Sequence, residues 1–205
     1  MRHLTLVLVL ALAAAVPSSA QNSTRTDPAS GATGQSSASA PTAPDLASQV
    51  PAPKSEDVKS MDALLHAIYD VISGPAGDRD WSRFRSLFVP QARLTKAAKG
   101  PDGGVAVRLL SVDDFVTAAG DAFKKESFYE SAIANRAQTF GNIAQVFSGY
   151  ESRHAPGEKP FQRGINSIQM FNDGKRWWVL SILWDEERPD NPLPPEFLKA
   201  SVRKK

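Results

Sequence analysis

The sequence predicts one α+β domain in which helices come first and a sheet of antiparallel strands follows. Up to about residue 124, apolar residues recur mainly at three- and four-residue spacing, which is typical of amphipathic helices. After residue 126 the chain changes to long stretches rich in β-branched and aromatic residues, separated by turn sequences. Helices followed by a strand meander favour an α+β fold over a parallel α/β fold.

Three helices are expected in the first half of the domain. The apolar stripe of residues 56–73 predicts the first, and a Gly-Pro pair directly after it predicts where it ends. A second, shorter helix is expected to begin after Asp80, whose side chain is a suitable N-cap. The third covers residues 113–124, and the spacing of Ser111 and Asp114 resembles a capping box with Asp in place of Glu.

A short strand is expected at residues 105–110, and four long strands follow at residues 128–139, 142–153, 161–171 and 176–186. The Asp173-Gly174 pair between the last two predicts a hairpin with a two-residue loop. Such a loop would set Asn172 opposite Lys175 and, further along, Asn166 opposite Ser181.

This register divides the last hairpin into two faces. One face would carry Gly164, Asn166, Ile168, Met170, Trp177, Val179, Ser181 and Leu183. The other would carry the apolar residues of the last strand Trp178, Leu180, Ile182 and Trp184. Helices can cover only one face, so a second copy of the domain is expected on the other, giving a homodimer. The alternative is that the tail, with Leu193, Phe197 and Leu198, folds back over that face.

The regions outside the domain predict export. Residues 1–20 combine Arg2, a short apolar run and a small-residue cleavage site, which indicates a secretory signal peptide. The run is shorter than the roughly 20 residues that span a bilayer, so an uncleaved anchor is the weaker alternative and no stable membrane insertion is expected after cleavage. Residues 21–55 are predicted to be a disordered Ser/Ala/Pro-rich spacer, and residues 188–205 a Pro-rich, basic tail. The mature protein is therefore expected in the periplasm or the medium.

Composition excludes several kinds of function. The 24 Lys and Arg residues nearly balance the 22 Asp and Glu residues, and no basic stripe interleaved with aromatic residues is present, so a nucleic-acid partner is not expected. The chain has no cysteine, which excludes disulfides, thiolate metal sites, cysteine nucleophiles and a lipoprotein anchor. No histidine or glutamate spacing typical of a metal site occurs, and neither a metal nor a cofactor is predicted.

Four groups of sequence blocks are characteristic: Trp81-Ser82-Arg83-Phe84 with Leu87-Phe88, residues 140–144 and 150–153, residues 163–168, and Asp173-Gly174 with Trp177-Trp178-Val179-Leu180. These blocks resemble those of bacterial exported members of the nuclear transport factor 2-like superfamily. The resemblance covers residues 58–187, within a predicted domain of residues 56–187. It implies a cone-shaped, curved antiparallel sheet with a mixed edge, three N-terminal helices on its concave face, and a pocket between the two. It also implies that the other face commonly forms a dimer.

The resemblance implies that Trp177 and Val179 pack beneath the helices, and the candidate site residues follow from that face. The expected ligand-binding residues are Tyr69, Trp81, Phe84, Asn166, Ile168, Trp177, Val179, Ser181 and Leu183. Asp185 and Tyr69 are the candidate catalytic residues: a desolvated carboxylate could act as a general base, and the Tyr69 hydroxyl could point into the cavity. Alternatively, Asp185 belongs to a solvated run of charges, and Tyr69 packs its ring and bonds a backbone acceptor.

Three functions remain open at this stage. The first is binding of a small apolar or amphipathic molecule in the cone. The second is an isomerase, cyclase or dehydratase of the kind found in SnoaL-like cyclases and ketosteroid isomerase, although the Tyr and paired Asp of that isomerase have no matching positions here. The third is a dimeric interaction domain whose cone is filled by its own side chains. Fold alone does not decide between them.

Overall fold

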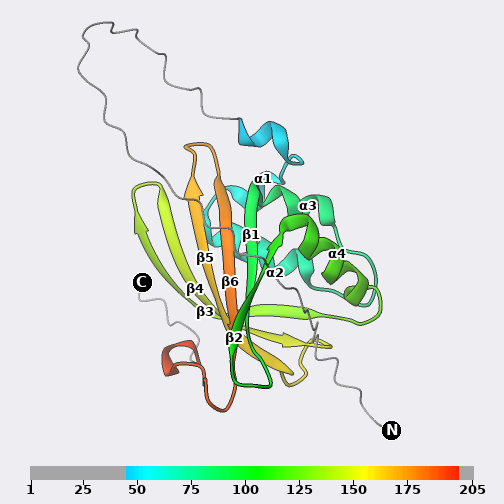
Figure 1. Cartoon of the computed structure of the whole chain (residues 1–205). Coiled ribbons are helices and arrows are strands. Elements are labelled where there is room, and N and C mark those ends of the chain that lie inside the picture. Colours follow the sequence, from blue (N-terminus) through cyan, green and yellow to red (C-terminus); the bar gives the residue numbers. More distant parts are fainter. Residues whose placement is uncertain (1–44, 199–205) are drawn as a thin grey trace, which may run out of the picture. The chain divides into compact units, whose positions relative to one another are not determined.

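The computed structural model describes residues 45–198, so the predicted signal peptide and most of the predicted spacer lie outside the described residues (Figure 1). The helical elements are η1 (Leu46–Gln49), α1 (Ser55–Val58), α2 (Met61–Ile72), α3 (Trp81–Ser86), α4 (Val112–Phe123) and η2 (Pro195–Phe197). The strands are β1 (Phe88–Lys99), β2 (Val105–Ser111), β3 (Tyr129–Phe140), β4 (Ile143–Arg153), β5 (Gln162–Asn172) and β6 (Trp177–Glu186).

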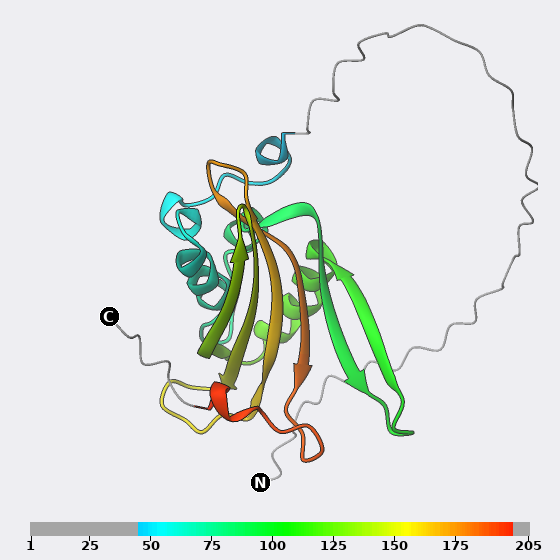
Figure 2. The ribbon, with the colours of Figure 1, turned by 90° about the vertical axis from the view of Figure 1, so that its left-hand side faces the viewer.

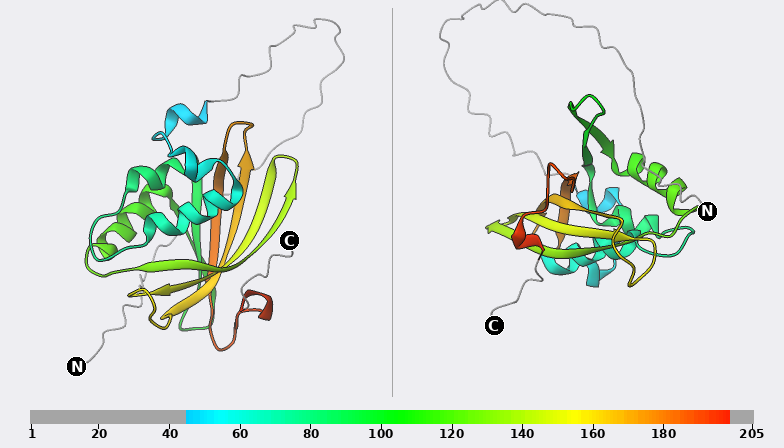
Figure 3. Two further views of the ribbon diagram at one scale, coloured as in Figure 1. Left: turned by 180° about the vertical axis from the view of Figure 1, so that it is seen from behind. Right: turned by 90° about the horizontal axis from the view of Figure 1, so that it is seen from below.

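All six strands form one curved sheet in the order β2-β1-β6-β5-β4-β3. The β1–β6 pair is parallel, and the other neighbouring pairs are antiparallel. The sheet bends around α2, α3 and α4, which lie on its concave face (Figures 2 and 3). The predicted α+β class and the curved, mostly antiparallel sheet are therefore confirmed. No helix within residues 45–198 is long and apolar enough to cross a membrane.

The predicted helices are present, but the first is divided in two. Ser60 interrupts it: its Oγ accepts a hydrogen bond from the Ala63 amide at 3.1 Å and so starts α2 as an N-cap. The predicted caps of the other helices are confirmed. The Asp80 carboxylate accepts from the Arg83 amide at 2.9 Å, and Ser111 and Asp114 form a complete capping box.

The sequence predicts no strand at residues 88–99, where the structure has β1, and Pro90 is the reason. Proline cannot donate a ladder hydrogen bond and is therefore unfavourable in a central strand. In the structure Pro90 lies where the β1–β6 register shifts, between Phe88 and Arg93. Pro90 is therefore accommodated in the irregular stretch of this pairing.

The predicted register of the β5–β6 hairpin is wrong. Asn172 pairs with Trp177, so the loop contains residues 173–176 instead of two residues. A bulge at Leu180 then adds one more residue to β6, because Met170 pairs with Val179 whereas Gln169 pairs with Ser181. Since side chains alternate between the faces of a strand, one extra residue moves every side chain after the bulge to the opposite face.

The convex face is consequently different from the one predicted. Trp178 does lie on the convex side, but it is fully buried, with the Arg176 guanidinium 3.7 Å above its ring. Ile182 belongs to the core, and Trp184 lies on the concave face opposite Asn166. Of the four residues predicted to form a dimer surface, Leu180 is the one with substantial exposure, at 41%.

The segments next to the predicted domain pack onto it. Leu46 and Val50 contact the hydrophobic core, so the folded unit begins before residue 56. At the other end, Phe197 is buried against Gly149, where a Cβ atom would come within 3.0 Å of the phenyl ring. Arg136 of β3 also donates a hydrogen bond to the Glu196 carbonyl at 2.8 Å. The tail thus covers the β3–β4 part of the convex face, as the alternative interpretation expected.

Candidate functional site

A chain of hydrogen bonds joins α2 to the concave face of the sheet. The Asn166 amide donates to the Tyr69 hydroxyl at 3.1 Å, and that hydroxyl lies 2.6 Å from the Ser148 hydroxyl. Ser148 uses its single proton to donate to Asn135 Oδ1 at 2.6 Å, so Tyr69 must be the donor to Ser148. Burial raises the pKa of Tyr69 well above its usual range. The Tyr69 proton is therefore fixed inside the protein.

Glu130 lies beside this chain at the start of β3. Ser73, the residue after α2, holds its backbone: the Glu130 amide donates to Ser73 Oγ at 2.9 Å, and the Ser73 hydroxyl proton is shared between the carbonyls of Tyr69 at 2.7 Å and Glu130 at 3.1 Å. The carboxylate accepts from the Ser152 hydroxyl at 2.8 Å and also interacts with the Asn166 side chain. Burial raises the pKa of Glu130 to about 7, although both hydrogen bonds favour the ionised form.

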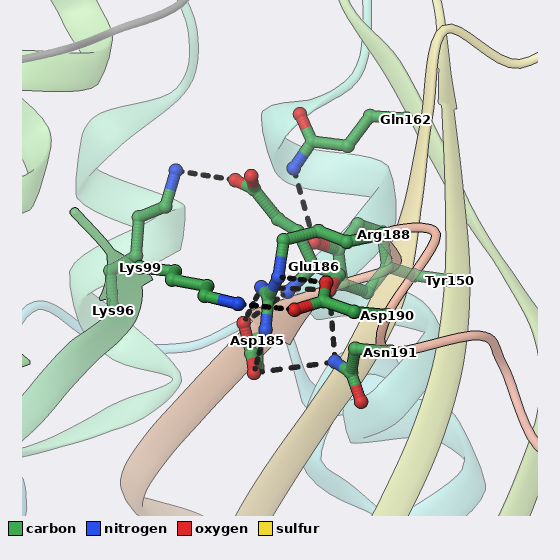
Figure 4. A network of polar contacts seen from close by, with 9 residues as sticks. All are labelled: Lys96, Lys99, Tyr150, Gln162, Asp185, Glu186, Arg188, Asp190 and Asn191. Carbon is green, nitrogen blue, oxygen red and sulfur yellow. Dashed lines mark hydrogen bonds and ion pairs between the residues drawn. The ribbon is translucent and has the colours of Figure 1, made fainter. Parts of the chain in front are cut away.

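Tyr150 occupies the next position on the same face. Its hydroxyl accepts a hydrogen bond from Gln162 Nε2 at 3.2 Å, and its side chain is almost completely buried (Figure 4). Gly164 of β5 makes room for it, because a Cβ atom there would lie 2.6 Å from the hydroxyl oxygen. Burial raises the pKa of Tyr150, and the negative charge of Glu130 raises it further. Tyr150 is therefore a neutral hydrogen-bonding group beside a carboxyl.

The remaining polar residues on this side come from β1 and β6. Glu186 forms an ion pair with Lys96 (Figure 4). Trp184, two residues before Glu186, is the strand partner of both Asn166 and Lys96, so its partly exposed indole shares the concave face with them. The concave face thus combines a carboxyl, hydroxyl and amide groups, and an indole ring.

Asp185, a predicted catalytic residue, is placed differently by the bulge. It lies on the convex side, and Arg188 donates to both of its carboxylate oxygens, at 2.5 and 3.1 Å (Figure 4). The Arg188 guanidinium therefore holds the pKa of Asp185 below its usual range. The expectation of a desolvated general base at this position is wrong, because a paired carboxylate is stabilised in its charged form.

The other predicted ligand-binding residues divide into three groups. Tyr69, Asn166 and Ile168 are brought together on the concave face, as expected. Trp81, Phe84, Trp177 and Val179 belong to the packing of the core, where Trp81 stacks on Phe123 at a ring distance of 6.1 Å. Ser181 and Leu183 lie on the convex face, opposite Gln169 and Ser167, because they follow the bulge. The predicted Asn166–Ser181 pair therefore does not form.

Two surface hollows border this cluster, and Ser73 lines one of them while Asn135 lines the other. One, of about 390 Å³, borders the α2–α3 loop, where Arg79 donates hydrogen bonds to four backbone carbonyls of residues 72–77. The other, of about 400 Å³, lies over the edge strand β3 and its neighbour β4. Within residues 45–198 no group of three or more potential metal ligands is present. Arg79 stabilises the loop at the first hollow, so the concave polar cluster is the better candidate site.

Glu130 and Tyr150 are not among the site residues that the sequence predicts. Glu130 lies in a correctly predicted strand, but its face depends on a second irregularity, between Ala132 and Ala134 in the β3–β4 pairing. A single Glu between a Tyr and a Ser carries no local sign of burial. Gly164, which leaves space for the Tyr150 hydroxyl, was the one available signal, since an isolated glycine in a strand often marks a close approach.

No protein-family model matches the chain, and no curated protein matches it in sequence. Several solved structures are similar in fold. A nuclear transport factor 2-like protein of unknown function from Silicibacter pomeroyi is 15% identical, with 63% of this chain and 94% of that one covered and a TM-score of 0.44.

Two further solved structures match a similar share of this chain. A protein of unknown function with a cystatin-like fold from Nostoc punctiforme is 10% identical over 65% of this chain and 92% of its own, with a TM-score of 0.49. A proposed dehydratase of the nuclear transport factor 2-like family from Streptomyces avermitilis is 13% identical over 64% and 96%, with a TM-score of 0.48. The proteins from Silicibacter pomeroyi and Streptomyces avermitilis are described as nuclear transport factor 2-like, and all three likenesses are likenesses of fold alone.

Proposed function

We propose that this protein binds a small amphipathic molecule on the concave face of its sheet. The observation that supports this function is the convergence of polar side chains from α2, β3, β4 and β5 above an apolar core. A few convergent polar groups in an otherwise apolar concave surface are typical of small-molecule sites.

Spare hydrogen-bonding capacity supports Glu130 and Tyr150 as the proposed ligand contacts. The Tyr69–Ser148–Asn135 chain is satisfied internally, so it supports the site without offering a proton to a ligand. A carboxyl has about four acceptor positions, of which Glu130 uses two, and the Tyr150 hydroxyl accepts from Gln162 while its own proton remains to be donated. Both groups can therefore bond a ligand without breaking an existing contact.

Acid–base catalysis is the second candidate function, and one observation favours it. A carboxyl with a pKa of about 7 is suited to take up a proton at neutral pH. In an isomerase or lyase, Glu130 would accept a proton from carbon while the Tyr150 hydroxyl donated a hydrogen bond to the adjacent carbonyl oxygen. Tyr69, a residue selected from the sequence for this role, would only orient Asn166.

The expected homodimer remains a proposal, with a revised surface. Its support is the apolar row on the convex face that the tail leaves open: Leu109, Leu183 and Phe147 are 66%, 45% and 44% exposed. They lie in one line across the sheet through Thr95 and Ser167.

Export is proposed on the signal sequence of residues 1–20 and predicts that the mature protein begins at Gln21.

Native mass spectrometry of the protein purified from the envelope and medium of its own host tests the binding function. We expect a small molecule bound to the wild type and to Glu151→Gln, a matched change on the convex side of β4. The same molecule should be lost from the double variant Glu130→Gln, Tyr150→Phe. Equal retention by all three proteins would place the ligand elsewhere and contradict the proposal.

A further inference from the structure

Glu130 differs from other carboxylates of the sheet because it forms no ion pair with an arginine or lysine of residues 45–198. The ion pairs within residues 45–198 include Glu151, Asp185, Glu186 and Glu187, each with an arginine or a lysine, but not Glu130. Its hydrogen-bonding partners, Ser152 and Asn166, are both neutral.

The groups around Glu130 do not supply the missing charge. The titratable side chains that face the cluster are Tyr69 from α2, Tyr150 from β4, Glu186 from β6 and Lys96 from β1. Both tyrosines are neutral, and Lys96 is paired with Glu186. The concave face therefore carries one unbalanced negative charge whenever Glu130 is ionised.

An unpaired, desolvated carboxylate is unfavourable, and either a proton or a cation can relieve it. The raised pKa of Glu130, about 7, is the response of the free protein, which takes up a proton. A cationic ligand would act in place of that proton and would make the ionised form favourable.

An aromatic surface suited to the rest of such a ligand lies on the same face. Trp184 is the strand partner of Asn166, and its indole is partly exposed. An indole ring packs against apolar groups and attracts cations through its π face. A molecule with a charged group and a short apolar body could contact Glu130 and Trp184 together.

We propose that the concave-face site takes a small organic amine, whose ammonium group pairs with Glu130 and whose apolar part packs against Trp184. The proposal rests on the binding function above and specifies its ligand class. It predicts that a proton and the amine compete for the Glu130 carboxylate.

Three compounds with one ring and different charges provide the test: benzylamine as the cation, benzyl alcohol as the neutral form and benzoate as the anion. Each is titrated into the isotope-labelled protein at pH 6 and pH 8, and the Trp184 indole N–H resonance is followed by NMR. The variant Trp184→Phe assigns that resonance among the four tryptophans of the chain.

Benzylamine is expected to bind best, and its Kd should fall about tenfold from pH 6 to pH 8, because the ionised fraction of Glu130 rises from about one tenth to about nine tenths around a pKa of about 7. In Glu130→Gln the preference for benzylamine and its pH dependence should both disappear, whereas Glu151→Gln should keep them. The glutamine side chain introduced by Glu130→Gln would still accept the Ser152 hydrogen bond, so the variant should fold.

The outcomes separate this inference from the binding function. Benzyl alcohol binding as well as benzylamine, with no effect of pH or of Glu130→Gln, would overturn the amine proposal and leave the binding function standing. If none of the three compounds shifts the Trp184 resonance while the host ligand also remains bound to the double variant, both proposals are wrong.

Discussion

The two faces of the sheet place the same residue types in opposite environments. On the concave face, polar groups such as Glu130, Tyr69 and Asn166 are hydrogen-bonded within one cluster, and no arginine or lysine of the described part of the chain pairs with the carboxyl. On the convex face, Asp185 is paired with Arg188 near the surface, while Leu183 is 45% exposed. Burying polar groups costs free energy, whereas single exposed leucines are common on protein surfaces. A functional site is therefore expected on the concave face, where polar groups are buried despite this cost.

The largest expected effect tests the part of the convex face that is covered. Phe197→Ala should destabilise the domain by about 3 to 5 kcal/mol, the usual cost of removing a buried phenyl ring. Phe197 is only 4% exposed and packs on Gly149. Urea denaturation measures the change, with Leu198→Ala as the control, because Leu198 is 48% exposed. Equal, small effects of both variants would show that the tail contributes little to stability.

The next largest effect is the pH dependence of stability that Glu130, the carboxyl on the concave face, should cause. A carboxyl whose pKa is higher in the folded protein stabilises it fully at low pH and loses that contribution as pH rises through the folded value. The pKa of Glu130 is raised from the reference value of 4.5 to about 7. At a pH above both values, this difference should lower the free energy of unfolding by about 3 kcal/mol. Glu130→Gln should therefore stabilise the domain by about that amount at pH 8 and hardly at all at pH 4. Urea denaturation at both pH values tests this; a pH-independent difference would contradict the raised pKa.

The buried hydrogen-bond chain should respond to a smaller change. Tyr69→Phe removes the acceptor of Asn166 and the donor to Ser148, and should cost about 1 to 3 kcal/mol because those groups stay buried. Tyr150→Phe removes one accepted hydrogen bond, from Gln162, and should cost less. Thermal unfolding compares the two variants. A larger loss for Tyr150→Phe would mean that Tyr150, not Tyr69, carries the structural role.

The smallest effect on stability is expected at the open part of the convex face. Leu183→Ser should change the stability of one copy by less than about 0.5 kcal/mol, as is usual for exposed positions. If the proposed homodimer forms through this face, the same variant should dissociate it. Sedimentation velocity provides the reading, with Ser181→Ala as the control on the same strand. A wild-type monomer, or an unchanged dimer of the variant, would be inconsistent with the proposal.

Local features were predictable from local sequence. The caps at Asp80 and Ser111 depend on residues within one helical turn, and strands β2 to β6 were placed to within one residue or two because their composition extends along their length. Strand β1 was not predictable, because Pro90 is normally excluded from a strand and only the register shift against β6 accommodates it.

The site depended on features that local sequence does not determine. The bulge at Leu180 placed Trp184 on the concave face and moved Ser181, Leu183 and Asp185 to the convex face. Tyr69 was found because it lies on a helix stripe, and Asn166 because it lies on β5, which has no extra residue in its pairing with β6. The role of Glu130 could not be predicted without knowing that Ser152 of β4 and Asn166 of β5 lie beside it.

By itself, the sequence determined the fold class, the order of most helices and strands, and the helix caps, because these depend on local periodicity and on cap and turn chemistry. Tertiary structure decided which side chains share a face, which carboxylate is paired and which is not, and how far the tail covers the sheet. The physical reason is that side chains alternate along a strand, so one added residue exchanges the two faces. The charge state of Glu130 then follows from neighbours that lie far away in the chain.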